Sequence, residues 1–267
     1  SFGTGGAVCV MCLLSGQNVW VSLLMALLAG LLAGFVTGIL HTFMGIPAIL
    51  AGILTQLSLY SINLKIMGKA NQAINVDKYN LLISLRWVKE FALHNPIVMI
   101  IIVTAVLIGV LYWFFGTELG CAIRATGDNE KMARAQGINT DTMKLLGLML
   151  SNGLVAFSGA LIAQNQRYAD ITMGQGAIVI GLASVIIGEV LFDRGGFLRR
   201  FFSMALGAVI YRIIIAFVIE LGMQPTDLRL FTAITVAAAL SIPNIHGKAI
   251  TLFRPRRVSA GCAVQSK

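Results

Sequence analysis

Charged residues are scarce in this chain. Asp, Glu, Lys and Arg make up 12% of its 267 residues, which is about half the share found in an ordinary soluble domain. Hydrophobic residues make up 57%, and they gather in runs close to the roughly 20 residues that a helix needs to cross a bilayer. We therefore predict an all-α fold: a polytopic membrane helical bundle of about six to eight hydrophobic segments, one of them short or re-entrant.

Motifs for catalysis and for nucleotide binding are also missing from the sequence. It contains no GxxxxGK[ST] phosphate loop, no HExxH and no GxSxG. The three histidines, His41, His94 and His246, lie far apart along the chain and form no ligand cluster. We predict a chain that is not an enzyme, with no catalytic residue, no metal site and no cofactor.

Cysteine and net charge each suggest a function that the context disfavours. Cys9 and Cys12 have CxxC spacing, but apolar neighbours surround them, so packing within a helix is favoured over zinc or redox chemistry. The net charge of +9 would suit a nucleic acid. Lys and Arg also collect on the cytoplasmic loops of membrane proteins, so we predict no nucleic-acid partner.

The hydrophobic runs predict the order of the segments. A Gly-rich segment at 3–14 is too short to cross the bilayer as a straight helix. The loop at 65–95 is expected to be coil over Asn71–Asp77, followed by an amphipathic helix over Tyr79–Leu93 that contacts membrane lipid. The predicted spans are 18–40, 46–64, 96–115, 145–163, 174–192, 201–219 and 230–242. In the first of these, Gly30, Gly34 and Gly38 recur on one face and predict a close helix-packing seam within the chain.

The longest polar run between two spans is the loop 117–144. Asp128 and Asn129 can cap a short helix over 130–136, and Gly137 provides a left-handed end. Asn139 or Thr140 is expected to begin the next helix. A short, capped, charged helix between two spans is suited to touching something outside the bilayer.

Charge predicts the orientation. If 117–144 lies in the cytoplasm, alternation also places 192–200 and a tail at 247–267 there, and these regions hold most of the Lys and Arg. The exception is 65–95, whose five basic residues would lie outside: Lys65, Lys69, Lys78, Arg86 and Lys89.

Polar residues within the spans are candidates for lining a solute pathway, since buried polar groups in a membrane must find partners or water. Helix–helix hydrogen bonding explains them equally well. The candidates are Gln56, Ser58, Asn63, Asn152 and Ser158. Arg212, within the span 201–219, should face protein, water or an acidic partner because lipid disfavours it.

The run from Gly127 to Thr140, GDNEKMARAQGINT, resembles the cytoplasmic coupling loop of ABC importer permeases, in the branch of branched-chain amino acid and ribose-type permeases. The resemblance extends over nearly the whole chain, including Ala51–Thr55 and Gly181–Glu189. The segment from Leu54 to Leu64 most resembles the subgroup associated with tryptophan or tyrosine uptake. The family's first transmembrane helix has no counterpart here, so we expect a helix to precede Ser1 of a single permease domain over 1–267.

The resemblance implies a multi-pass permease subunit of an ABC importer in the cytoplasmic membrane. It moves a small solute, with an amino acid as the leading substrate and a nucleoside or sugar as the alternatives. Its implied partners are an ABC ATPase subunit, an extracytoplasmic solute-binding lipoprotein and a second permease subunit, identical or different. A channel or ion-coupled carrier without an ATPase is the alternative function. The implied ATPase-docking residues are Asp128, Asn129, Glu130, Lys131, Met132, Ala133, Arg134, Ala135, Gln136 and Gly137.

Overall fold

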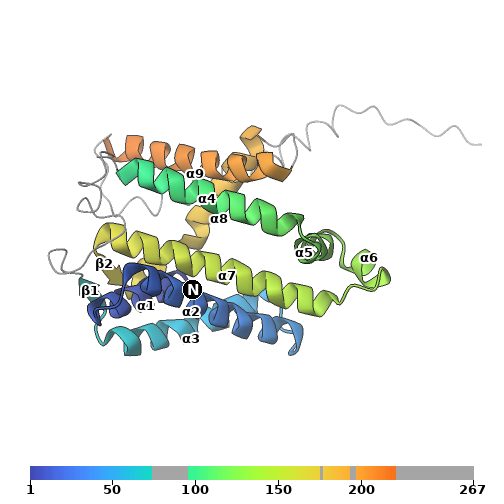
Figure 1. Cartoon of the computed structure of the whole chain (residues 1–267), viewed down its shortest axis with the longest axis horizontal. Coiled ribbons are helices and arrows are strands. Elements are labelled where there is room, and N and C mark those ends of the chain that lie inside the picture. The colour runs from blue at the N-terminus through green and yellow to red at the C-terminus, as the bar shows by residue number, and fades with distance from the viewer. Residues whose placement is uncertain (74–95, 175–176, 193–196, 221–267) are drawn as a thin grey trace, which may run out of the picture. The chain divides into compact units, whose positions relative to one another are not determined.

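The computed structural model describes residues 1–73, 96–174, 177–192 and 197–220, which are almost entirely helical (Figure 1). Their contacts divide the chain into two compact units, residues 1–177 and 178–267, each of which is treated by itself below. In the described part, four helices are long and apolar enough to cross a membrane, a bent helix pair gives a fifth candidate, and two shorter apolar helices accompany them. The predicted polytopic helical membrane fold is confirmed.

Unit 1 contains most of the helices and the one pair of strands found among the described residues. Its elements are α1 (Phe2–Leu14), α2 (Val19–Thr42), α3 (Ala48–Met67), β1 (Asn71–Ala73), α4 (Pro96–Gly116), α5 (Glu118–Asp128), α6 (Glu130–Ala135), α7 (Thr140–Gln166), β2 (Tyr168–Asp170) and the 3-10 turn η1 (Ile171–Gly174).

The 27-residue helix α7 is the centre of unit 1, with α1 and α2 packed along it. The packing depends on residues without side chains. A Cβ on Gly30 would lie 2.6 Å from the carbonyl oxygen of Asn152, and a Cβ on Gly34 would lie 2.6 Å from Cα of Met149. Gly5 and Gly159 make still closer approaches between α1 and α7. The predicted glycine seam is therefore confirmed, and its partner is α7.

The core between these three helices consists largely of small side chains, because the backbones lie so close together. Ala7, Ala26, Ala160 and Ala163 are fully buried there, and the larger Leu13 fills the end nearer β2. In lipid, helices gain no hydrophobic free energy from associating, so this close contact provides the van der Waals attraction that holds them together.

A sharp bend of 83° separates α4 from α5. Thr117 caps α5 by accepting a hydrogen bond from the amide of Gly120 at 3.3 Å. Gly120 is buried, and its Cα lies so near Phe114 and Phe115 that a Cβ there would overlap their backbone. The sequence had indicated a polar loop with one short helix over 117–144, whereas the structure has two, since Glu118–Asp128 is also helical.

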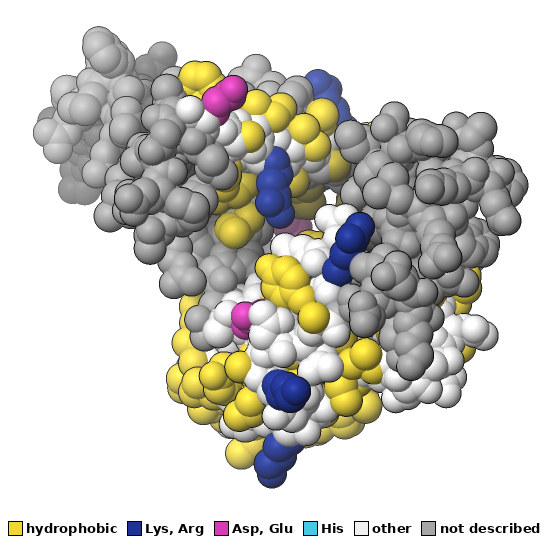
Figure 2. Space-filling model, turned by 90° about the vertical axis from the view of Figure 1, so that its left-hand side faces the viewer, with side chains coloured by type: hydrophobic (Ala, Val, Ile, Leu, Met, Phe, Trp, Pro, Cys, Tyr) yellow, Lys and Arg dark blue, Asp and Glu magenta, His cyan; other side chains and the backbone are white. Residues whose placement is uncertain are grey.

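A short antiparallel ribbon joins the loop after α3 to the loop after α7. Gln72 pairs with Ala169, flanked by Asn71 with Asp170 and Ala73 with Tyr168. The prediction of coil over Asn71–Asp77 was therefore wrong for Asn71–Ala73. Figure 2 looks onto the side of Figure 1 that carries this ribbon, and among the described residues seen there the Lys and Arg side chains lie singly.

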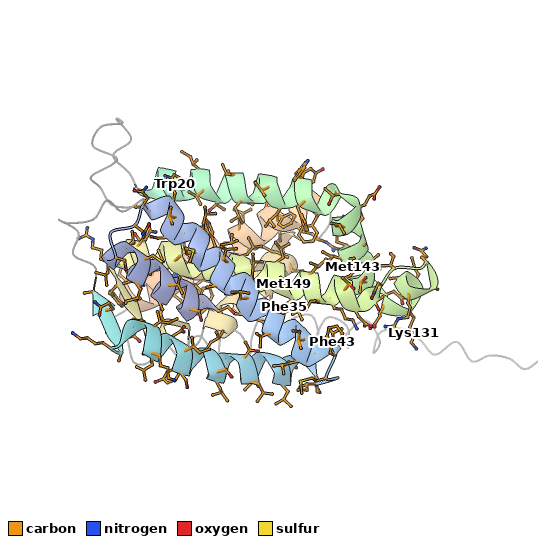
Figure 3. All side chains as sticks on the ribbon, turned by 60° about the horizontal axis from the view of Figure 1, so that its bottom comes forward. Trp20, Phe35, Phe43, Lys131, Met143 and Met149 are labelled. Carbon is orange, nitrogen blue, oxygen red and sulfur yellow. The ribbon has the colours of Figure 1, made fainter. Side chains whose placement is uncertain are left out.

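The two ends of unit 1 carry different elements. Figure 3 shows Trp20 and Phe43 at opposite ends of α2, with Phe43 at the end nearer Lys131 of α6. The charged turn containing α6 and the β1–β2 ribbon therefore lie at opposite ends of α7 (Figure 1). The two therefore lie on opposite sides of the membrane that α7 crosses, and the cytoplasmic location of 117–144 stays a prediction.

Unit 2 contains α8 (Ala177–Phe192) and α9 (Phe197–Glu220) among its described residues. These helices also meet through glycines: a Cβ on Gly207 would lie 2.6 Å from the amide nitrogen of Gly188. Ser203 donates a hydrogen bond to the carbonyl of Gly188 at 2.6 Å. The predicted amphipathic helix at 79–93, the span at 230–242 and the tail at 247–267 lie outside the described residues.

Replacing Gly30 by Ala tests the seam. We expect the free energy of unfolding of the Gly30→Ala protein to be about 1–3 kcal/mol lower than that of the wild type, because the added methyl group overlaps α7. Gly52→Ala is the matched control, since a Cβ on this helical glycine meets nothing within 4 Å; it should be neutral or gain up to about 1 kcal/mol of helix propensity. Thermal unfolding in detergent measures both, and equal effects would contradict the seam.

Candidate functional site

The turn between α5 and α7 is built from two side-chain caps. Asn129 ends α5 and begins α6, accepting a hydrogen bond on Oδ1 from the amide of Met132 at 3.1 Å. Asn139 accepts from the amide of Thr142 at 3.3 Å and begins α7. The predicted short helix is confirmed at Glu130–Ala135. Both caps follow the preference of Asn for the residue that precedes a helix.

Gly137 reverses the chain after α6. Its φ of +83° is in the left-handed region that glycine adopts without strain. The amide of Gly137 then bonds to the carbonyl of Arg134, and the amide of Ile138 bonds to the carbonyl of Ala133, both at 3.1 Å. These bonds end α6 within one residue of the predicted position and turn the chain back toward α7.

Two ion pairs and a hydroxyl group tie α6 to the first turns of α7. Lys144 Nζ lies 2.7 Å from Glu130 Oε1, and Arg134 Nη2 lies 3.3 Å from Asp141 Oδ1. The Arg134 side chain also donates to Thr140 Oγ1, at 3.2 Å from Nε and 2.8 Å from Nη2, and Thr140 is buried. We call these five residues, Glu130, Arg134, Thr140, Asp141 and Lys144, the charge clip.

The clip is electrostatically balanced around Glu130. The hydrogen bond from Lys144, its charge and the charge of Arg134 lower the pKa of the Glu130 carboxyl below its ordinary value. His41, near the end of α2, adds to the same effect. Glu130 is therefore ionised and paired with Lys144 at neutral pH.

The ten predicted docking residues divide into two groups by exposure. Ala133 is fully buried, and Glu130 and Arg134 are engaged in the clip. The exposed members are Asp128, Asn129, Lys131, Met132, Arg134, Ala135, Gln136 and Gly137, and of these Arg134 also belongs to the clip. Met132 is the large apolar side chain of this group, and it is 52% exposed.

The predicted pathway residues do not gather at one place. Gln56, Ser58 and Ser158 are exposed; the hydroxyls of Ser58 and Ser158 donate to carbonyls of their own helices. Asn152 lies half-buried in the α2–α7 seam, where Nδ2 donates to the carbonyl of Leu148 at 2.9 Å.

Asn63 differs from the other four, because it is 4% exposed and its Oδ1 finds no hydrogen-bond partner among the described residues. It lies near Gly3, where an added Cβ would sit 3.6 Å from its Nδ2. A metal site finds no support in the described residues, since no three His, Cys, Asp or Glu side chains gather there.

Sequence reasoning missed Thr140 and the α5 helix as parts of this site. The i, i+4 spacing of Glu130 and Arg134 was a visible signal for one contact of the clip. The bonds from Arg134 to Thr140 depend on how tightly Gly137 folds the chain back, which residue spacing alone does not show.

Comparison with known proteins places this arrangement in a class. The family described as "Branched-chain amino acid transport system / permease component" matches residues 1–239. A tyrosine transport system permease protein of Clostridioides difficile (strain R20291) is 40% identical over 250 residues, which cover 92% of this chain and 80% of that protein. No solved structure gives a significant match.

Other relatives carry names for different solutes. The fructose import permease protein FruF of Bifidobacterium longum is 28% identical over 260 residues, covering 96% of this chain and 71% of that protein. The autoinducer 2 import system permease protein LsrC of Yersinia pestis is 32% identical over 183 residues, covering 67% of this chain and 50% of that protein.

The chain is thus a multi-pass transport protein of the cytoplasmic membrane, with apolar helices and a charged turn at one end. It belongs to the permease component family of branched-chain amino acid transport systems, and it is a permease subunit of an ABC importer. The function expected from the sequence is confirmed at this level.

Arg134→Ala tests the clip. Removing the guanidinium breaks the contacts to Thr140, Asp141 and Glu130, so we expect amide hydrogen exchange over 130–138 to quicken up to about fivefold, the upper end of the range for an exposed ion pair. Lys131→Ala removes a neighbouring cation that lies outside the clip and should leave the rates unchanged. Equal exchange in the two variants would show that the clip does not hold α6.

The lowered pKa of Glu130 predicts a pH dependence. Ionised Glu130 stabilises the turn above its ordinary pKa of 4.5, and this contribution disappears as the pH falls through the lower pKa of the folded turn. Exchange over 130–138, corrected for intrinsic rates, should differ between wild type and Glu130→Gln at about pH 7 and converge at about pH 3. In a Lys144→Ala background, exchange should differ little at any pH between the protein with Glu130 and the protein with Glu130→Gln. A full difference in that background would contradict the pairing of Glu130 with Lys144.

Proposed function

We propose that α6 is the docking element for an ABC ATPase subunit, and that ATP hydrolysis takes place in that partner. The observation that carries the proposal is a short capped helix, fixed by the charge clip to α7, whose outer surface remains uncovered. The sequence contains no phosphate-binding loop of its own. A chain of this kind needs ATP chemistry from outside.

In this proposal the two groups of α6 residues have different tasks. Met132 and Ala135 give an apolar contact for a groove on the ATPase, with Lys131 and Gln136 at its edge. Glu130, Ala133 and Arg134 face the turn itself and fix the angle between α6 and α7. Closure of the ATPases would then move α6 and α7 as one body, because the contacts of Glu130 with Lys144 and of Arg134 with Thr140 and Asp141 bridge the two helices.

The other partners follow from the class of transporter. A second permease subunit would complete the solute pathway, and a solute-binding lipoprotein would deliver the solute at the end that carries the β1–β2 ribbon. The loaded binding protein and ATP then bias the same two-state membrane pathway from opposite sides.

Tyrosine or a similar aromatic amino acid is the proposed solute. The support is the 40% identity, over 92% of this chain, to a protein named as a tyrosine transport permease. Relatives named for fructose and autoinducer 2 match at lower identity or over less of the chain. The named classes differ chemically, because an amino acid carries both an ammonium and a carboxylate group whereas a sugar carries neither.

Met132→Glu tests the docking site. In proteoliposomes containing the complete transporter, we expect ATP hydrolysis stimulated by the loaded binding protein, and L-tyrosine uptake, to fall at least about tenfold, because a charge in an apolar contact is left unpaired. Met44→Glu is the matched control: Met44 is 64% exposed on the turn between α2 and α3. Normal coupling in Met132→Glu would overturn the docking assignment, whereas coupling without L-tyrosine uptake in the wild type would overturn only the substrate.

A further inference from the structure

Arg212 lies in α9 within the membrane-crossing stretch Arg199–Phe217. Its side chain is exposed on unit 2, and the ion pairs found among the described residues do not include it. An Arg at the centre of a membrane helix costs about 2.5–3.5 kcal/mol even on the lower scale, and the cost falls toward the helix ends. Such a side chain must therefore reach water, another protein surface or an anion.

Three faces of α9 can be told apart by burial and by the size of their side chains. Ser203, Gly207 and Tyr211 recur every four residues, are buried, and form the contact with α8. The large side chains point elsewhere and are exposed, as lipid contact requires: Phe202, Leu206, Val209, Ile213 and Phe217. Arg212 is on neither face.

The third face combines Arg212 with small residues. Ala208 and Ala216 lie one turn before and one turn after Arg212, and Ala205 lies close to the same line. Lipid-facing surfaces of α2 and α9 use large side chains instead, such as Leu24, Leu28 and Phe217. Small residues around a cation leave room for water or a ligand beside the helix.

We propose that this face of α9 lines the solute pathway and that Arg212 binds the carboxylate group of the transported solute. The proposal rests on the proposed function and narrows its substrate to a carboxylate-bearing solute. In a water-filled pathway the guanidinium keeps its hydration, and it can take up a carboxylate through two parallel hydrogen bonds. A fixed cation also raises the local concentration of anionic groups.

The position of Arg212 leaves a second way of reaching water. Arg212 is five residues from the outer end of the stretch, about 8 Å at 1.5 Å per residue, so a long side chain could extend to the outer surface through lipid. A cysteine at this position is too short to do so. Its reactivity with water-soluble reagents therefore separates a pathway from an extended side chain.

Three adjacent single-cysteine variants make the test, because successive residues of a helix point 100° apart. Tyr211→Cys, Arg212→Cys and Ile213→Cys sample the α8 contact, the proposed pathway and the lipid face. The background carries Ser at Cys9, Cys12, Cys121 and Cys262. The probes are a charged, membrane-impermeant methanethiosulfonate and a lipid-soluble maleimide.

We expect the charged reagent to modify Cys at 212 at least about tenfold faster than at 211 or 213, because the ionised reagent does not enter lipid or packed protein. Reaction at 212 with the lipid-soluble reagent alone would place the residue in lipid and overturn the proposal. Disulfide-linked dimers through 212, without reaction with the charged reagent, would make this face a subunit interface and overturn it as well. Neither outcome depends on an ATPase, so a failure here is distinct from a failure of docking at α6.

The carboxylate is tested by uptake of L-tyrosine in the complete transporter. We expect Arg212→Gln to lower uptake at least about tenfold and Arg212→Lys to retain a substantial part, because Lys keeps the charge but loses the paired hydrogen bonds. Undiminished uptake in Arg212→Gln would overturn the carboxylate contact even if position 212 is accessible to water. Absence of L-tyrosine uptake in the wild type would instead count against the proposed substrate.

Discussion

The close approach of α1 and α2 to α7 is the contact on which unit 1 depends. It is possible because the backbones meet at Gly5, Gly30, Gly34 and Gly159, where a Cβ would overlap the neighbouring helix. Hydrophobic residues cannot provide this specificity in lipid, since a leucine is as well solvated by hydrocarbon as by another helix. The small residues therefore fix which helices meet, and the large ones are left to cover the outside.

The same division explains what could be foreseen from the sequence. Spans and caps are local signals: Asn129, Gly137 and Asn139 determine helix ends through bonds to their immediate neighbours. The glycine seam was visible as a spacing, but its partner was not. The β1–β2 pairing joins residues 71–73 to 168–170, and nothing near either segment identifies the other. The 83° bend between α4 and α5 brings Gly120 against the backbone of α4. The sequence does not reveal this contact, so neither the bend nor α5 was predicted.

The candidate site shows the same limit at the level of side chains. Its residues between 128 and 137 could be named from composition and capping, and the helix lies where it was expected. The sequence could not predict which of these residues contact α7, because those contacts depend on Thr140, Asp141 and Lys144 of that helix. Ala133 illustrates the point: its small apolar side chain suits a docking groove equally well, yet it is fully buried in the turn. Arg212, in contrast, could be singled out from the sequence alone, because an Arg within a hydrophobic span is costly in lipid.

The length of α7 has a mechanical consequence. Its 27 residues make a rod about 40 Å long at 1.5 Å per residue, with the clip at one end and the ribbon at the other. A tilt of about 10° about one end would displace the other end by about 7 Å, which is more than the rise of about 5.4 Å of one helical turn. The rod thus acts as a lever. When α1, α2 and α7 tilt together, the glycine contacts between them are kept, and a small rotation at the clip becomes a larger displacement at the ribbon.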